Sequence, residues 1–166
     1  MPGTPSLRAS CWMDKNLKAP AHARAWLRAV LGSARVEQAM PSVADFTESS
    51  ELLLSELVTN GVTHAETAVE IRCSMQRSDG LIDLFVEVSD FAPQRRINRS
   101  EMIDDQLTHG RGMGIIELVA TDWGIRYTAT AKTVWFLLRE EMPLDRPTVS
   151  TGGASSVETD CYVNSL

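Results

Sequence analysis

The stretch SELVTNGVTHA, residues 55–65, decides the fold because it combines the apolar rhythm of a buried helix with three polar residues spaced four apart. A helix advances about 100° per residue, so Glu56, Asn60 and His64 fall along one side of it. Leucine, valine, glycine and alanine occupy most of the other positions. We therefore predict a mostly buried helix that presents a carboxylate and an amide, one turn apart.

Around this stretch, the pattern predicts a long helix followed by a β-hairpin. The helix begins near Ser42, because serine is a good N-cap. Gly61 costs about 1 kcal/mol relative to alanine inside a helix, so close packing or the close approach of a ligand must favour glycine there. The period then changes to two over residues 69–75, and LIDLFVEVSD, residues 81–90, predicts the second strand of the hairpin.

The remaining elements complete an α+β pattern. Apolar spacing predicts a helix over residues 21–31, and GRGMG, residues 110–114, leads into an apolar helix over 115–120. WGIRYTA at 123–129 and KTVWFLLRE at 132–140 predict two closing strands. This order predicts a two-layer sandwich, in which helices cover one face of a mainly antiparallel, mixed sheet.

The chain of 166 residues fits a single domain. Residues 1–10 are rich in proline, glycine and serine and predict a flexible arm, and 11–142 form the domain. Residues 143–166 have the composition of a disordered tail. The polar segment 91–110 is a long connection for a compact domain, and such connections are often functional.

Composition excludes several functional classes. The net charge of −6 argues against nucleic-acid binding, which usually requires a basic patch. Cys11, Cys73 and Cys161 lie far apart without a CxxC pair, which favours neither a zinc site nor a disulfide framework. Cys73 is predicted to be a small buried apolar residue. We find no apolar leader and no segment of membrane-spanning length, so we expect a cytoplasmic protein without membrane contact.

The Glu56–Asn60 pair can support phosphate chemistry. An asparagine carbonyl oxygen suits Mg²⁺, which prefers oxygen ligands and retains waters and substrate phosphates. A carboxylate one turn earlier can accept a proton from an attacking hydroxyl. The alternative is that these residues are the solvated face of an amphipathic helix, and an isolated ExxxN pattern favours that alternative.

Asp90 ends an apolar strand, where its carboxylate could accept a hydrogen bond from an exocyclic amine. Such a site favours adenine, which donates at that position, over guanine, which presents a carbonyl. Alternatively, Asp90 begins a turn.

The glycine run can hold phosphates. Alternating glycines before a helix let backbone N–H groups approach phosphate oxygens, and the helix dipole favours the anion. Its spacing and context fit neither a Rossmann fingerprint nor a P-loop. A flexible hinge is the alternative. The run consists of Gly110, Arg111, Gly112, Met113 and Gly114.

In their order along the chain, these motifs resemble the GHKL superfamily of ATP-binding domains, and more closely its anti-sigma-factor serine/threonine kinase branch. ELVTNGVTHA at 56–65 matches the family's N box, and VEVSDFAP at 86–93 matches its G1 box. GRGMGIIELVATDWG at 110–124, with KTVWFLL at 132–138, matches the G2 box and the last strand. The resemblance covers roughly residues 12–141 and implies the Bergerat ATPase fold.

The resemblance implies ATP and Mg²⁺ as cofactors and assigns roles to the motif residues. Asn60 would hold Mg²⁺, and Glu56 would act as the base. Asp90 would bind the adenine amino group, with Thr133 supporting it. The glycine run would cradle the phosphates at the hinge of a lid formed by 91–109, where Arg111 would contact phosphate or pack in the lid.

Two positions depart from the family pattern. Ala92 stands where the family usually has glycine, and its methyl group would crowd the adenine, while Phe91 would fill or line the pocket. Ala131 likewise precedes Lys132 where relatives often have glycine. These differences bear on nucleotide affinity more than on the fold.

The function implied is an ATP-dependent serine/threonine protein kinase and anti-sigma factor that acts by partner switching. Its substrate would be a small anti-sigma-antagonist-like protein, a sigma factor would be the rival partner, and a homodimer is a family expectation. Two alternatives remain open: a catalytically silent, nucleotide-gated protein-binding module, or a degenerate relative that no longer binds ATP.

Overall fold

The computed structural model describes residues 6–34, 43–65, 67–78, 80–92, 112–141 and 158–161. Its elements, in chain order, are β1 (Ser6–Met13), α1 (Ala19–Ser33), α2 (Val43–Asn60), the π-helical turn η2 (Gly61–Ala65), β2 (Val69–Ser78), β3 (Leu81–Asp90), α4 (Gly112–Val119), β4 (Asp122–Tyr127), β5 (Lys132–Glu141) and β6 (Glu158–Cys161).

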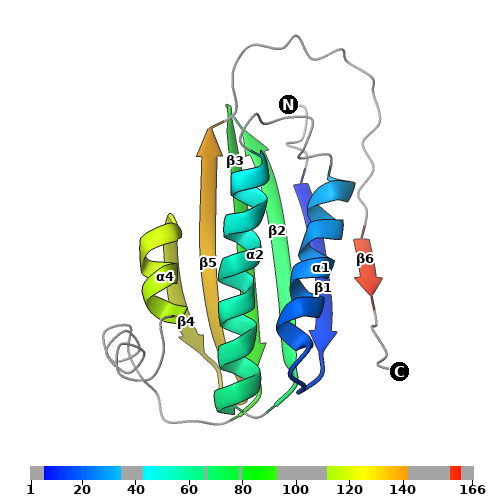
Figure 1. The fold of residues 1–166 in the computed structure, drawn as a ribbon, viewed down its shortest axis with the longest axis vertical. Coiled ribbons are helices and arrows are strands. Elements are labelled where there is room, and N and C mark those ends of the chain that lie inside the picture. The colour runs from blue at the N-terminus through cyan, green and yellow to red at the C-terminus, as the bar shows by residue number, and fades with distance from the viewer. Residues whose placement is uncertain are drawn as a thin grey trace.

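The described strands form one sheet in the order β4-β5-β3-β2-β1-β6. The pairings from β4 to β1 are antiparallel, and β6 runs parallel to β1. Helices α1, α2 and α4 lie on one face of this sheet (Figure 1). The structure therefore confirms the predicted α+β, two-layer architecture with a mainly antiparallel, mixed sheet.

The predicted β2–β3 hairpin is confirmed, and its register sets the position of Asp90, one of the predicted site residues. The pairing runs from Ser78 opposite Leu81 to Val69 opposite Asp90. Gly80 in the turn has φ = 78°, a left-handed conformation that favours glycine. Every second side chain of β3 is buried against the helices, and Asp90 is the last of them. A carboxylate thus ends a row of apolar core residues.

Both ends of the domain differ from the sequence-based boundaries. Residues 6–10 belong to β1, although we expected a flexible arm over 1–10. They pair with β2, beginning with Ser6 opposite Gln76, and local composition does not reveal such a distant partner. Residues 158–161 form β6 within the segment expected to be disordered. The rest of the 143–166 tail lies outside the described residues.

The core between helices and sheet is apolar, as the pattern predicted. Cys73 lies in it, and burial raises the pKa of its thiol to about 12, so the side chain remains neutral at physiological pH. None of the described helices is both long and apolar enough to cross a bilayer. The largest fully buried side chains include those of Leu27, Leu53, Ile71, Leu84, Met113 and Phe136.

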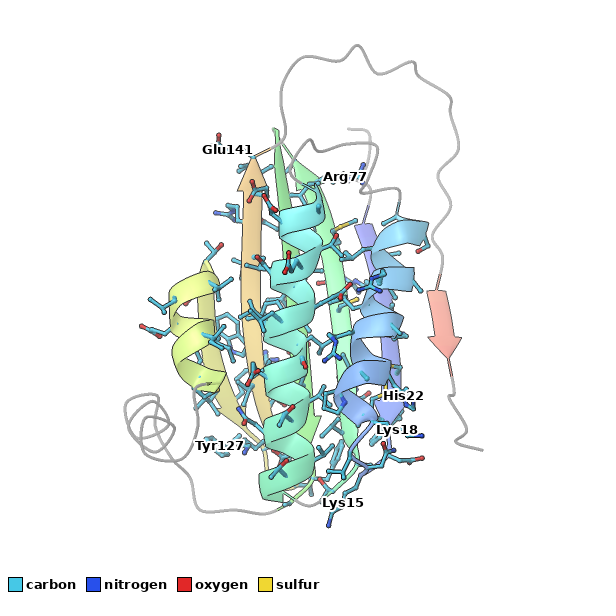
Figure 2. The ribbon with its side chains drawn as sticks, in the orientation of Figure 1. Lys15, Lys18, His22, Arg77, Tyr127 and Glu141 are labelled. Carbon is cyan, nitrogen blue, oxygen red and sulfur yellow. The ribbon has the colours of Figure 1, made fainter. Side chains whose placement is uncertain are left out.

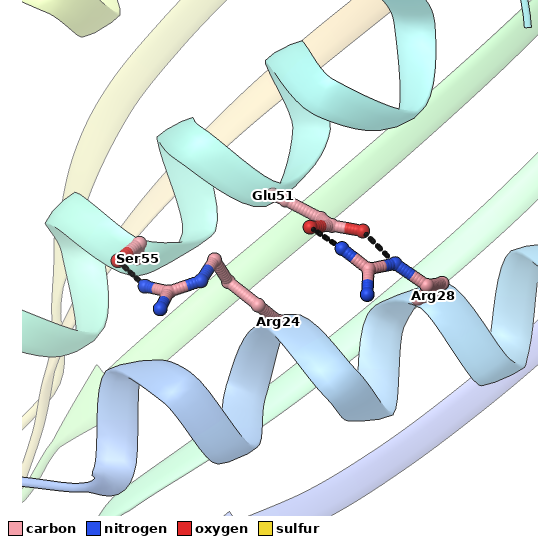
Figure 3. Close-up of polar contacts among 4 residues, drawn as sticks. All are labelled: Arg24, Arg28, Glu51 and Ser55. Atoms are coloured by element: carbon pink, nitrogen blue, oxygen red, sulfur yellow. Dashed lines mark hydrogen bonds and ion pairs between the residues drawn. The ribbon is translucent and has the colours of Figure 1, made fainter. Parts of the chain in front are cut away.

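Polar contacts between α1 and α2 fix the rotation of α2 about its axis (Figure 3). Arg28 donates two hydrogen bonds, of 2.7 and 2.6 Å, to the carboxylate oxygens of Glu51. Arg24 Nη1 on α1 donates a hydrogen bond of 2.7 Å to Ser55 Oγ, which lies one turn further along α2 than Glu51. Because successive helical residues are about 100° apart, anchoring Ser55 toward α1 also fixes the direction of Glu56.

Gly61, at the junction of α2 and η2, is required by close packing. A Cβ atom built on Gly61 would lie 2.6 Å from Val69 Cγ1, well inside the contact distance of two carbon atoms. Val69 is fully buried and β-branched, so its side chain has little freedom to move away. This contact explains why the helix accepts the cost of glycine.

Gly61→Ala should therefore destabilise the protein. Overpacking costs about 1–3 kcal/mol, which outweighs the gain in helix propensity of about 1 kcal/mol. In a Val69→Ala background the same substitution should be neutral or stabilising, because the clashing methyl is gone. Urea unfolding of the wild type, Gly61→Ala, Val69→Ala and the double variant measures the coupling free energy between positions 61 and 69.

Gly32→Ala is the matched control, since a Cβ atom there meets none of the described residues within 4 Å and α1 should gain up to about 1 kcal/mol. If Gly61→Ala were as stable as Gly32→Ala, the packing explanation would be wrong.

Candidate nucleotide-binding site

The predicted site residues converge at one end of the domain. The C-terminal ends of α2 and β3 and the start of β5 lie together at the lower end in Figure 1, and α4 begins on that side as well. Asp90 pairs with Val69 on one side and with Lys132 on the other. Because Val69 packs against Gly61, the residue after Asn60, the end of α2 lies over this end of the sheet.

Asn60 presents a buried polar atom at this end. Its Nδ2 is buried and has no hydrogen-bond partner among the described residues. A rotation of the amide by 180° exchanges Nδ2 and Oδ1, so the side chain can offer a donor to a phosphate oxygen or an acceptor to a cation. Glu56 lies one turn earlier and is half-buried. The side chain of His64 is outside the described part of the structure.

Asp90 carries a second unpartnered atom. The residue is 3% exposed, and its Oδ2 lies 3.1 Å from Lys132 Nζ. Its Oδ1 is buried and lacks a hydrogen-bond partner in the described segments. Leaving a buried acceptor unsatisfied costs about 1–3 kcal/mol, more when it is charged. A ligand that donates a hydrogen bond to Oδ1, such as one with an amino group, would remove this cost.

Thr133 is not brought together with Asp90. Its Oγ1 is hydrogen-bonded to Ser89 Oγ over 2.8 Å, and strand alternation places both side chains on the face away from the helices. Lys132 occupies the position beside Asp90 instead, and sequence reasoning did not select it. Counting alternate positions back from the buried Val134 and Phe136 would have identified Lys132 as the inward-facing residue.

Phe91 also differs from the expectation that it fills or lines the pocket. Its ring stacks on Trp12, with centroids 5.1 Å apart and planes inclined by 20°. Trp12 is 42% exposed between two core residues of β1, so it projects from the face away from the helices. The Phe91 N–H donates to Thr67 Oγ1 over 3.3 Å. Phe91 is thus directed away from Asp90.

The start of α4 supplies backbone N–H groups. Gly112 is its first residue, and the first four N–H groups of a helix have no intrahelical partner. Met113 is fully buried, so it anchors the helix to the core and could meet a ligand only through its backbone. A Cβ atom built on Gly114 meets nothing within 4 Å in the described part of the structure, so packing against those residues does not require glycine there. Gly110, Arg111 and the lid expected over 91–109, apart from residues 91 and 92, lie outside the described residues.

Among the described residues, acidic, histidine and cysteine side chains do not by themselves form a metal site at this end of the domain. Within the described segments, these side chains form no group of three or more that could bind a metal. Mg²⁺ with Asn60, phosphate oxygens and waters as ligands is compatible with this arrangement, because Mg²⁺ commonly keeps waters and phosphates in its shell.

The fold and the site together define a nucleotide-binding α+β domain. The model of the family described as the histidine kinase-like ATPase domain matches residues 16–138, and the chain belongs to that family, within the GHKL superfamily. This assignment supports nucleotide binding, ATP in particular. No curated protein sequence matches the chain.

Gly114→Ala should separate nucleotide binding from folding. In the absence of ligand, the variant should be as stable as the wild type or up to about 1 kcal/mol more stable, because α4 gains helix propensity. If phosphates approach this turn, the added methyl should reduce the thermal shift caused by Mg–ATP. Thermal unfolding with and without Mg–ATP measures both effects. An unchanged ATP shift would show that no ligand approaches Gly114.

Proposed function

We propose that this protein is an ATP-dependent serine/threonine protein kinase and anti-sigma factor that acts by partner switching. The observation that supports it best is the pair of buried, unpartnered atoms, Asn60 Nδ2 and Asp90 Oδ1, at the end of the domain where Glu56 is half-buried. The family assignment supports nucleotide binding, and the resemblance of the N and G boxes to anti-sigma-factor kinases supports the finer function.

Each residue has one task in this proposal. Asp90 accepts a hydrogen bond from the adenine amino group and so orients the base. Asn60 holds Mg²⁺, which when bound would neutralise charge on the phosphates. The N–H groups at the start of α4 position the phosphate chain. Phosphoryl transfer depends largely on such positioning and electrostatics.

Glu56 receives the proton in the transfer step. A serine or threonine hydroxyl of the protein substrate forms the new bond to the γ-phosphorus of ATP, the bond to the β,γ-bridging oxygen breaks, and ADP leaves. The hydroxyl proton passes to the Glu56 carboxylate. Because Glu56 is half-buried, its carboxylate can still contact a substrate. The contacts between α2 and α1 hold the helix, and with it Glu56, in a fixed direction.

The protein substrate in this proposal is a small anti-sigma-antagonist-like protein, and a sigma factor is the competing partner. Phosphorylation of the antagonist would weaken its binding by adding negative charge at the interface. The kinase would then be available to the sigma factor. A homodimer is part of the same proposal.

Glu56→Gln should abolish transfer and spare ATP binding. Mg–ATP at 100 times its dissociation constant should raise the melting temperature of wild type and variant alike by about 5–11 °C. Transfer of labelled phosphate from ATP to serine of an antagonist-like protein should fall at least about 100-fold, because a general base typically contributes that much.

Glu48→Gln is the matched control, since Glu48 is exposed on the same helix two turns earlier and should retain full transfer. Loss of the ATP shift in Glu56→Gln would show that Glu56 is structural. ATP binding by the wild type without transfer to the antagonist-like protein would favour the nucleotide-gated binding module instead.

A further inference from the structure

Lys132, which forms a buried ion pair with Asp90, has no task in the function proposed above. The Asp90 and Lys132 side chains lie opposite each other on the paired strands β3 and β5. They are only 4% and 9% exposed, respectively. They belong to a cross-strand row that continues to Tyr127 of β4, labelled in Figure 2 at the lower end of the molecule. Lys132 faces the helices, because it precedes the buried Val134 by two residues.

An ammonium group has three hydrogens to donate, and the Asp90 carboxylate has two oxygens that accept. The contact at 3.1 Å joins Lys132 Nζ to Asp90 Oδ2 only, so Oδ1 keeps its accepting capacity and is buried without a partner in the described segments. The ion pair thus places a cationic donor next to an unfilled acceptor. A ligand that offers a donor and an acceptor on neighbouring atoms would complement both.

We propose that Lys132 is a second base-recognition residue, which donates a hydrogen bond to ring atom N1 of adenine while Asp90 Oδ1 accepts one from the 6-amino group. Adenine carries this donor and this acceptor on adjacent atoms of one edge. In the same pose guanine would face Asp90 with a carbonyl oxygen and Lys132 with an N–H, so both contacts would be lost. The inference rests on the proposed nucleotide binding and adds a specificity residue to it.

Ligands that lack one ring nitrogen test this role on the wild-type protein. The 1-deaza analogue of ATP has C–H in place of N1 and cannot accept a hydrogen bond there. Its dissociation constant should exceed that of ATP roughly tenfold or more, because hydrogen bonds to charged donors are the stronger ones. The 7-deaza analogue is the matched control, since N7 lies off this edge, and it should bind like ATP. Calorimetric titration with Mg²⁺ present measures all three.

Variants at position 132 test whether Lys132 causes the weaker binding of 1-deaza-ATP. Lys132→Met keeps the length of the side chain without a donor, so ATP and 1-deaza-ATP should bind it equally. Lys132→Arg keeps a cationic donor and should retain a preference for ATP. If Lys132→Met fails to fold because Asp90 loses its partner, the comparison of ATP with 1-deaza-ATP on Lys132→Arg, which keeps the ion pair with Asp90, takes its place, and loss of the preference for ATP there would overturn the role.

Equal binding of ATP and 1-deaza-ATP by the wild type would overturn the role of Lys132 and leave nucleotide binding intact. Tighter ATP binding by Lys132→Met than by the wild type would also overturn it, because Lys132 would then occupy the position of the base. Failure of the wild type to bind any of the three nucleotides would overturn the proposed function itself.

Discussion

The contact between Gly61 and Val69 is the constraint on which the arrangement of this end of the domain depends. It brings the end of α2 close to β2, one strand away from Asp90. A side chain at position 61 would separate helix and sheet at the end of the domain where α2 ends at Asn60 and β3 ends at Asp90. The contact involves no charged group and no ligand, so the site geometry is set by core packing before any nucleotide arrives.

The Asp90–Lys132 pair gives a second reason to regard this end as functional. Removing two charges from water is expensive, and well-packed apolar residues in their place are often as stabilising or more so. Every other inward-facing residue of β3 is apolar, so the sheet could have continued its pattern here. A buried pair with one carboxylate oxygen left without a partner in the described segments is difficult to explain by stability, and the proposed recognition of a ligand would account for it.

The sequence predicted most of the fold, because the period of the apolar residues changes clearly between helices and strands. It also placed Asp90 at a strand end, and Asn60 on the same side of a helix as Glu56, one turn later. It selected Thr133 and not Lys132 as the neighbour of Asp90, because both are polar and a step of one residue along a strand changes the face. It missed residues 6–10 and β6 because those strands depend on distant pairing partners, which local patterns do not encode.

The structure gives a physical reason for Phe91, which precedes the departure from the family pattern at Ala92. On the face away from the helices, Ser89 is held by Thr133 and Phe91 stacks on Trp12, while Thr67 binds the Phe91 backbone. The residues on both sides of Asp90 are therefore anchored. On the face toward the helices, the ion pair with Lys132 holds the Asp90 carboxylate. Fixing an acceptor in advance lowers the entropy lost when a ligand binds. A bulky residue after Asp90 can thus support the proposed nucleotide recognition while its own ring is directed away from Asp90.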